Sequence, residues 1–150
     1  MELINEGMII LDLNLDGKKE VIELIADILK GNHRISSKRA YIDDVYEREN
    51  LIPTAIGDMI AIPHAVSSAV DHSSLVFLRL NKEIEWTKEE KVKYVFGIAV
   101  PKMNKNNEHL NIISMIARNI LDKDFKQLIF NTTSKEVCLA KFNECSNQII

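Results

Sequence analysis

The sequence lacks the features of secreted, disulfide-stabilised proteins. It has two cysteines in 150 residues, Cys138 and Cys145, and both lie in a segment that we predict to be helical. The seven-residue separation puts them about 10 Å apart on a helix, which is too far for a disulfide. A chain without paired cysteines is typical of a reducing compartment, so we expect a cytoplasmic protein.

Long apolar runs are also absent. The longest, Tyr94 to Val100, is far short of the roughly 20 residues that cross a bilayer. The first residues, MELINEGMII, do not have the basic and then apolar layout of a secretory signal. We therefore expect no direct membrane insertion.

Neither sign of charge is in large excess. The 19 Lys and Arg against 22 Asp and Glu give a formal net charge of −3, and the basic residues are scattered along the chain. This balance disfavours nucleic acid as the main partner. The chain is 46% hydrophobic and 27% charged, as in globular proteins. Its length favours a single domain over residues 1–150.

Strand-like and helix-like segments alternate along the chain. Apolar and β-branched runs predict strands at 8–13, 59–62, 74–80 and 92–100. Amphipathic spacing predicts helices at 17–30, 37–49, 108–121, 123–130 and 134–144. No helix separates 74–80 from 92–100. We therefore expect an α/β fold: a mixed, mostly parallel sheet with an antiparallel edge pair, flanked by helices.

Small polar residues mark the expected helix starts. Asp16 is the expected N-cap of the first helix, and Ser36 or Ser37 that of the second. Thr133-x-x-Glu136 has the pattern of a capping box and opens the last helix.

The familiar catalytic motifs are missing, so the histidines become the candidates. The chain has no P-loop, no GxGxxG, no GxSxG, and neither HExxH nor CxxC. Of its four histidines, His33 and His72 lie in polar loops, where a solvated side chain is expected. His64 and His109 occupy more informative positions.

His64 follows a short apolar strand. Pro63 cannot donate a backbone N–H, so we expect it to end the strand at 59–62 and to leave His64 just past that end. Ligands of open α/β sheets bind outside the carboxyl ends of strands. On spacing alone two interpretations stay open, a reactive histidine and a structural histidine bonded to a nearby carbonyl.

His109 and Arg48 are weaker candidates on spacing alone. His109 precedes Ile112 and Ile113 by three and four residues, so it shares the buried face of its helix, near an N-terminus that favours anions. It either donates a hydrogen bond to a ligand oxygen or caps the edge of the core. For Arg48, in YEREN, spacing favours a surface ion pair with a flanking glutamate, Glu47 or Glu49.

A set of motifs in a fixed order favours a functional interpretation of His64, His109 and Arg48. The set comprises Arg48-Glu49, Pro53-Thr54, Gly57, IAIPH at 60–64, GIAV at 97–100, NNEHL at 106–110 and NTTSKEV at 131–137. Together they resemble enzyme IIA of the bacterial phosphoenolpyruvate-dependent sugar phosphotransferase system, mannitol/fructose type, with NNEHL more similar to the mannitol branch. The resemblance spans nearly the whole chain and implies one EIIA type-2 domain over 1–150.

The resemblance implies a phosphotransferase that works through a phosphohistidine. In that family the histidine of IPH is phosphorylated, which corresponds to His64, and Arg48 and His109 match residues lining the same site. The implied donor is a phosphohistidine of the carrier protein HPr. The implied acceptor is a cysteine of the IIB component of a mannitol or fructose permease. No cofactor and no metal are implied.

Two local departures from the family pattern affect how the partner proteins fit and which sugar is transported. Ala65 stands where glycine is common, and the loop at 101–107 is slightly longer than in relatives. We expect Met59, Ala65 and Val66 to supply apolar contacts to the partner proteins, with Ser67 and Ser68 as a polar rim.

Two other functions stay open. One is a regulatory IIA-like domain, nitrogen-type or part of a transcriptional regulator, that signals by its phosphorylation state. The other, less favoured, is a metal-binding protein in which the two histidines act with Glu108 or Asp58. This second function matches no known ligand spacing.

Overall fold

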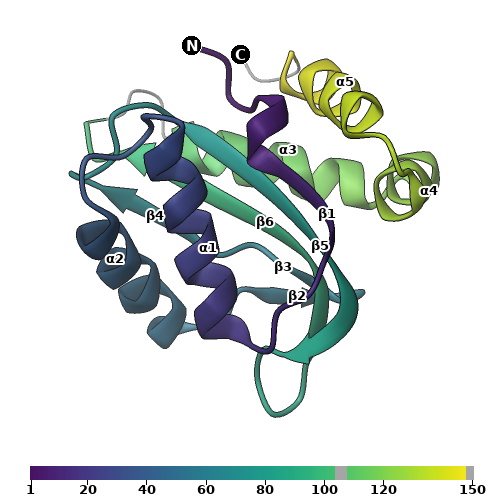
Figure 1. The fold of residues 1–150 in the computed structure, drawn as a ribbon, viewed down its shortest axis with the longest axis horizontal. Helices are drawn as coiled ribbons and strands as arrows, with labels where there is room; N and C mark the ends of the chain where they lie inside the picture. The colour runs from purple at the N-terminus through teal and green to yellow at the C-terminus, as the bar shows by residue number, and fades with distance from the viewer. Residues whose placement is uncertain (104–107, 148–150) are drawn as a thin grey trace.

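The computed structural model describes residues 1–103 and 108–147 of the chain (Figure 1). The helices are α1 Lys18–Gly31, α2 Lys38–Leu51, α3 Glu108–Ile120, α4 Lys123–Asn131 and α5 Lys135–Ser146, with a 3-10 turn η1 at Glu6–Met8. The strands are β1 Ile9–Leu13, β2 Ala55–Gly57, β3 Ile60–Ala61, β4 His64–Ser67, β5 Ser74–Glu85 and β6 Lys91–Pro101.

One mixed sheet organises these elements. Its strand order is β1-β5-β6-β3-β2, and β4 also pairs with β6. The long central pair, β5 with β6, is antiparallel, while β1 lies parallel to β5, and β3 and β4 lie parallel to β6. The expected α/β fold, a mixed sheet flanked by helices, is confirmed. The antiparallel pair predicted from 74–80 and 92–100 lies at the centre of the sheet, and a second antiparallel pair, β2 with β3, forms the edge.

Helices cover both faces of the central strands. In Figure 1, α1 and α2 lie on one side of the sheet and α3 lies behind it. Residues Ser74 to Leu80 of β5 are buried without alternation, as expected for a strand covered on both faces. A Cβ added at Gly97 of β6 would lie 2.9 Å from Cδ1 of Ile25, so glycine allows the close approach of α1.

The path through His64 differs from the prediction. The strand before Pro63 does end, at Ala61, as expected, but His64 opens a further strand that was not predicted: β4 begins at His64 and pairs in parallel with β6, with His64 opposite Ile98. Pro63 lacks an N–H but keeps its carbonyl, which accepts a hydrogen bond from the Ile98 N–H at 3.0 Å. Strands β3 and β4 therefore pair with the same strand, β6, on either side of Ile62 and Pro63.

Two predicted caps lie one residue away from the observed ones. Gly17, not Asp16, precedes α1, without a side-chain cap. Ser134, not Thr133, caps α5, and its hydroxyl accepts from the Val137 N–H at 3.2 Å. Because α5 begins one residue later than predicted, the neighbouring serine takes the capping role.

Two further predictions concern the absence of a disulfide and of a membrane-spanning segment. Cys138 and Cys145 are both buried free thiols on α5. Within residues 1–103 and 108–147, no helix combines the length and apolar character needed to cross a bilayer.

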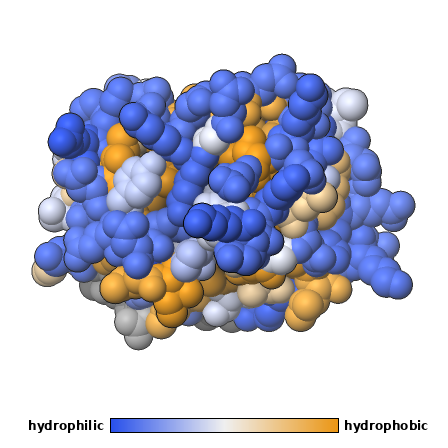
Figure 2. All heavy atoms as spheres, turned by 90° about the horizontal axis from the view of Figure 1, so that it is seen from below, coloured by the Kyte–Doolittle hydropathy of each residue, from blue (hydrophilic) through white to orange (hydrophobic). Residues whose placement is uncertain are grey.

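Viewed from below, most of the surface is polar, and apolar surface gathers along one margin of that face (Figure 2).

Candidate functional site

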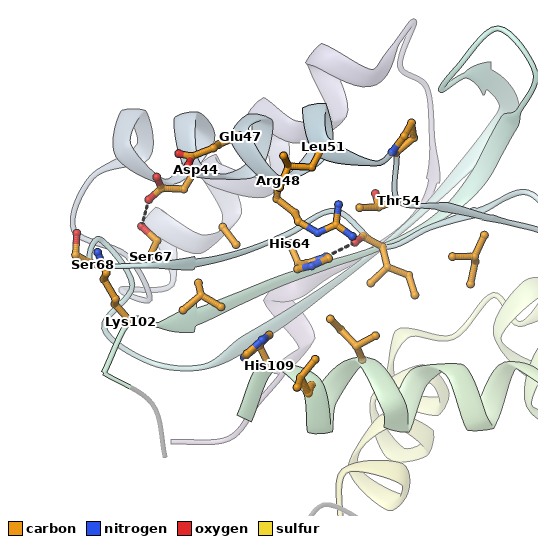
Figure 3. Close-up of a pocket in the computed structure, with 17 residues that line it drawn as sticks. Asp44, Glu47, Arg48, Leu51, Thr54, His64, Ser67, Ser68, Lys102 and His109 are labelled. Atoms are coloured by element: carbon orange, nitrogen blue, oxygen red, sulfur yellow. Dashed lines mark hydrogen bonds between the residues drawn. The ribbon is translucent and has the colours of Figure 1, made fainter. Parts of the chain in front are cut away.

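A groove of about 780 Å³ lies between α2, β4 and the start of α3. His64, Arg48 and His109 all line it, although they come from three different elements. Figure 3 shows Arg48 reaching from α2 toward the His64 ring and His109 on the other side of the groove, at the start of α3. The structure thus brings together the three residues singled out in the sequence.

His64 is half-buried at the beginning of β4, with its ring orientation fixed. Nδ1 lies 2.8 Å from the carbonyl oxygen of Ile62. A carbonyl only accepts, so the network assigns the proton to Nδ1. The described residues make no hydrogen bond to Nε2, which keeps a free lone pair. Spacing left open a reactive histidine and a structural histidine bonded to a carbonyl. His64 has the carbonyl bond, and that bond is what leaves the other nitrogen, Nε2, with a free lone pair.

The surroundings of His64 favour the neutral imidazole. Burial is the largest effect and lowers the pKa of His64, because desolvation disfavours the charged ring. The bond to the Ile62 carbonyl and the charge of Glu49 raise this pKa. The positive charge of Arg48 and the electrostatic effect of His109 lower it. The net pKa lies below the ordinary value of 6.5, so the ring is neutral at pH 7.

Arg48 occupies the last turn of α2, which begins after Ser37, the cap whose hydroxyl accepts from the Ala40 N–H. The surface ion pair predicted from spacing is wrong, because no ion pair of Arg48 occurs among the described residues. Instead its Nη1 donates to the carbonyl oxygen of Ile52 at 2.7 Å. A guanidinium has five N–H donors, so most of them remain available to an anion in the groove.

A buried tyrosine fixes α2 against the strand that carries this site. The Tyr41 hydroxyl donates to the Ile98 carbonyl oxygen at 3.0 Å, and Ile98 is the residue opposite His64 in β6. Because Tyr41 and Arg48 lie on the same helix, this contact holds the helix that carries Arg48 against the strand paired with His64.

His109 is half-buried in the first turn of α3. Its Nδ1 is buried and has no hydrogen-bond partner among the described residues. Ile113, one turn later, also lines the groove, as the shared helical face predicts. An unpartnered buried nitrogen is costly, so this ring is held at the groove with one nitrogen unsatisfied.

The expected partner-contact residues are only partly accessible. Val66 is 36% exposed and Met59 is 42% exposed, whereas Ala65 is 3% exposed and offers almost no surface, which corrects the prediction for it. Ser68 is exposed, but Ser67 is buried, and its hydroxyl donates to Oδ2 of Asp44 at 2.6 Å. The side chains of β4 alternate, so the residues on either side of Val66 face inward.

Sequence reasoning missed the most connected polar residue near the site. Glu49 is 3% exposed and accepts hydrogen bonds from Lys18, Thr54 and Trp86. The motif contained Glu49, and its position four residues after Val45 and eight after Tyr41, both buried on α2, is the signal that could have placed it on the inner face of the helix.

In the described part of the chain, no group of three or more His, Cys, Asp or Glu residues is placed to hold a metal ion. Asp58 instead pairs with Lys126, with Oδ2 and Nζ 3.4 Å apart. The side chain of Glu108 and residues 104–107, part of the longer loop, lie outside the described residues.

Comparisons with known proteins agree with these observations. The family described as "Phosphoenolpyruvate-dependent sugar phosphotransferase system, EIIA 2" matches residues 2–145. The mannitol-specific phosphotransferase enzyme IIA component of Bacillus subtilis is 33% identical over 147 residues, covering 96% of this chain and 99% of that protein.

Solved structures share the fold. The nitrogen regulatory protein IIA-Ntr of Neisseria meningitidis has a TM-score of 0.81 and 25% identity, covering 92% of this chain and 94% of its own. Enzyme IIA mannitol of Escherichia coli, in complex with phosphorylated enzyme IIB mannitol, has a TM-score of 0.78 and 23% identity, covering 95% and 99%.

Proposed function

Because the chain belongs to the EIIA 2 family of the phosphoenolpyruvate-dependent sugar phosphotransferase system, we propose that His64 carries a phosphoryl group between two proteins. The donor is a phosphohistidine of HPr, and the acceptor is a cysteine of the IIB component of a mannitol or fructose permease. In this proposal residues 1–150 form one cytoplasmic domain, in keeping with a family match over residues 2–145.

The observation that carries the proposal is the bond between Nδ1 of His64 and the Ile62 carbonyl. It leaves the lone pair of Nε2 available, and the lowered pKa keeps that lone pair unprotonated at pH 7. A neutral imidazole attacks phosphorus without a separate base. The bond from Nε2 to phosphorus forms as the nitrogen–phosphorus bond of the donor breaks, and the donor histidine recovers its lone pair.

Arg48 and His109 then act on the phosphoryl oxygens. Phosphoryl transfer depends mainly on positioning and on neutralising charge at the three equatorial oxygens. The free N–H groups of Arg48 supply a permanent charge, and charge-assisted bonds are about twice as strong as neutral ones. His109, which also lines the groove, supplies an N–H donor from the ring nitrogen that carries the proton.

Onward transfer runs the same geometry in reverse. A cysteine thiolate of IIB attacks phosphorus on the side opposite Nε2, a sulfur–phosphorus bond forms, and His64 recovers its neutral ring. Because the site must first accept the phosphoryl group from HPr and then release it to IIB, it needs to stabilise the transferring group without binding it tightly.

The surface around the groove suits protein partners. Four exposed apolar side chains line it: Leu51, Ile56, Val66 and Leu110. Contiguous exposed apolar surface marks protein contact sites. A similar protein of this fold has been solved with a phosphorylated IIB component, which supports IIB as the acceptor here.

A regulatory role is the second candidate. The likeness to the IIA-Ntr protein of Neisseria meningitidis, at a TM-score of 0.81, favours it. The residues at the groove would be the same, but the phosphorylation state of His64 would be read by a regulatory partner in place of a permease.

One reconstitution separates the candidates. The chain is incubated with phosphoenolpyruvate, enzyme I and HPr, and mannitol IIB is then added. Fructose IIB is added in a parallel reaction. A permease component becomes phosphorylated and passes the group to one of the two IIB proteins. A regulatory domain is phosphorylated but passes the group to neither. A chain that takes no phosphoryl group from HPr contradicts both.

A further inference from the structure

Glu49 joins four segments of the chain through one buried carboxylate. Its Oε1 accepts from the Thr54 N–H at 2.8 Å, from Trp86 Nε1 at 2.8 Å and from Lys18 Nζ at 3.0 Å. Its Oε2 accepts from the Thr54 hydroxyl at 2.6 Å. These partners lie at the start of α1, before β2 and after β5, whereas Glu49 is in the last turn of α2.

This carboxylate stays ionised. Burial raises the pKa of Glu49, but the bonds from Thr54, Trp86 and Lys18 lower it, and the net pKa lies below its ordinary range. A buried charge is tolerated only where donors surround it. An ionised carboxylate accepts with both oxygens and cannot donate, so it holds the N–H and hydroxyl of Thr54 together.

A continuous line of hydrogen bonds leads from Glu49 to His64. Thr54, held by Glu49, accepts from the Ile62 N–H with its carbonyl at 3.0 Å. The Ile62 carbonyl then accepts from Nδ1 of His64 at 2.8 Å. Both links after Thr54 end on backbone carbonyls, so the position of the Ile62 carbonyl depends on where Thr54 is fixed.

The same turn also carries the contact of Arg48. The guanidinium donates to the Ile52 carbonyl at 2.7 Å, two residues before Thr54. Neighbouring residues on α2, Arg48 and Glu49, therefore grip the 52–54 turn at its two ends, one from the groove side and one from the core.

We propose that Glu49 is a positioning residue that sets the tautomer and orientation of His64 through Thr54 and Ile62. It touches neither substrate nor reacting atoms. A free neutral imidazole favours the proton on Nε2, so a displaced Ile62 carbonyl would let the proton move there. The lone pair needed for attack would then be blocked. The consequence for rate rests on the proposed phosphoryl transfer, but the tautomer itself does not.

The test measures the His64 tautomer by long-range ¹⁵N–¹H NMR in the unphosphorylated protein. Glu49→Gln replaces one accepting oxygen by an amide nitrogen, which donates and cannot accept. We expect the wild type to be Nδ1–H, Glu49→Gln to show a large Nε2–H fraction, and its rate of phosphorylation per folded molecule to fall about tenfold, as misplaced reacting groups do. Thr54→Val, which removes only the hydroxyl, shifts the tautomer in the same direction, and Thr54→Ser restores it.

Matched controls remove partners of Glu49 that lie off this line. Lys18→Met and Trp86→Phe each delete one donor to Oε1 but leave both Thr54 contacts in place. Both are expected to lower the free energy of unfolding and to keep the Nδ1–H tautomer. A merely structural Glu49 predicts that all these variants lose stability alike and that none changes the tautomer.

The result that overturns the proposal is an unchanged Nδ1–H tautomer in folded Glu49→Gln and in Thr54→Val. If Glu49→Gln does not fold, Thr54→Val decides alone. Failure of the proposed function looks different, because the tautomer would respond to these substitutions while no phosphoryl group is accepted.

Discussion

The Nδ1 proton of His64 is held by the carbonyl oxygen of Ile62, two residues earlier, at 2.8 Å. This short-range contact decides which nitrogen can react. It also links the histidine to the backbone of the preceding turn, so the orientation of the His64 ring depends on residues that lie outside the groove.

The first prediction concerns pH. Because the pKa of His64 is lowered, the ring takes up a proton only below the ordinary histidine value of about 6.5. The rate of phosphorylation should be constant near pH 7 and fall at more acidic pH, with a midpoint below that value. The free energy of unfolding depends on pH in the same direction, because the folded protein binds the His64 proton more weakly than the unfolded chain does. The contribution of His64 to stability is full above about pH 6.5 and is lost as the pH falls toward the lower folded pKa. An NMR titration of the His64 ring measures the midpoint, and one at or above 6.5 contradicts the expected environment.

The second prediction concerns the charge of Arg48. Arg48→Met removes a cation that lowers the pKa of His64, so that pKa should rise. The same variant should lose about 10²-fold in transfer rate, the usual cost of deleting one charge-stabilising donor. Arg48→Lys keeps the charge without the fork of donors, and it should retain the low pKa and an intermediate rate. Rapid-quench measurements with phospho-HPr provide the rates. A wild-type rate in Arg48→Met would exclude a role in the reaction.

The third prediction separates acceptance from onward transfer at His109. His109→Ala removes the donor, and we expect His64 still to be phosphorylated but transfer to IIB to slow by about 10²-fold, the value of a hydrogen bond to a charged group. His109→Gln keeps an N–H donor and should recover part of that loss. Single-turnover transfer from the phosphorylated chain to IIB measures both. Equal rates in the wild type and in His109→Ala would remove this residue from the site.

The fourth prediction tests the docking surface with two matched valines. Val66 lines the groove and is 36% exposed, and Val137 on α5 is 40% exposed but does not line it. Val66→Asp should raise the KM for phospho-HPr about tenfold, since a charge in an apolar contact costs about 1–3 kcal/mol. Val137→Asp should leave it unchanged. If Val66→Asp transfers like the wild type, the partner does not cover this part of the surface.

Sequence patterns predicted the mixed sheet and its helices because periodicity is a local property. Helix α1 starts and ends within one residue of its predicted range, and β5 and β6 contain their predicted strands. The motif order also indicated the family, which the comparisons confirm. Spacing alone did not bring Arg48, His64 and His109 together, since they lie on α2, β4 and α3.

The errors have a common physical cause. The ion pair predicted for Arg48 was wrong because Glu49 turns inward to Lys18 and Trp86, which are distant in sequence. The strand before Pro63 ends as expected, but the prediction missed β4, which resumes the pairing with β6 at His64. Both outcomes depend on partners that a local pattern does not contain.

The most direct test of the central claim is the position of the phosphoryl group. The ¹⁵N-histidine-labelled chain is phosphorylated by phosphoenolpyruvate, enzyme I and HPr, and nitrogen–phosphorus coupling identifies the bonded atom. We expect one acid-labile phosphoryl group, on Nε2 of His64, and none on His64→Ala. A phosphoryl group on Nδ1 of His64, or full labelling of His64→Ala, would contradict the account.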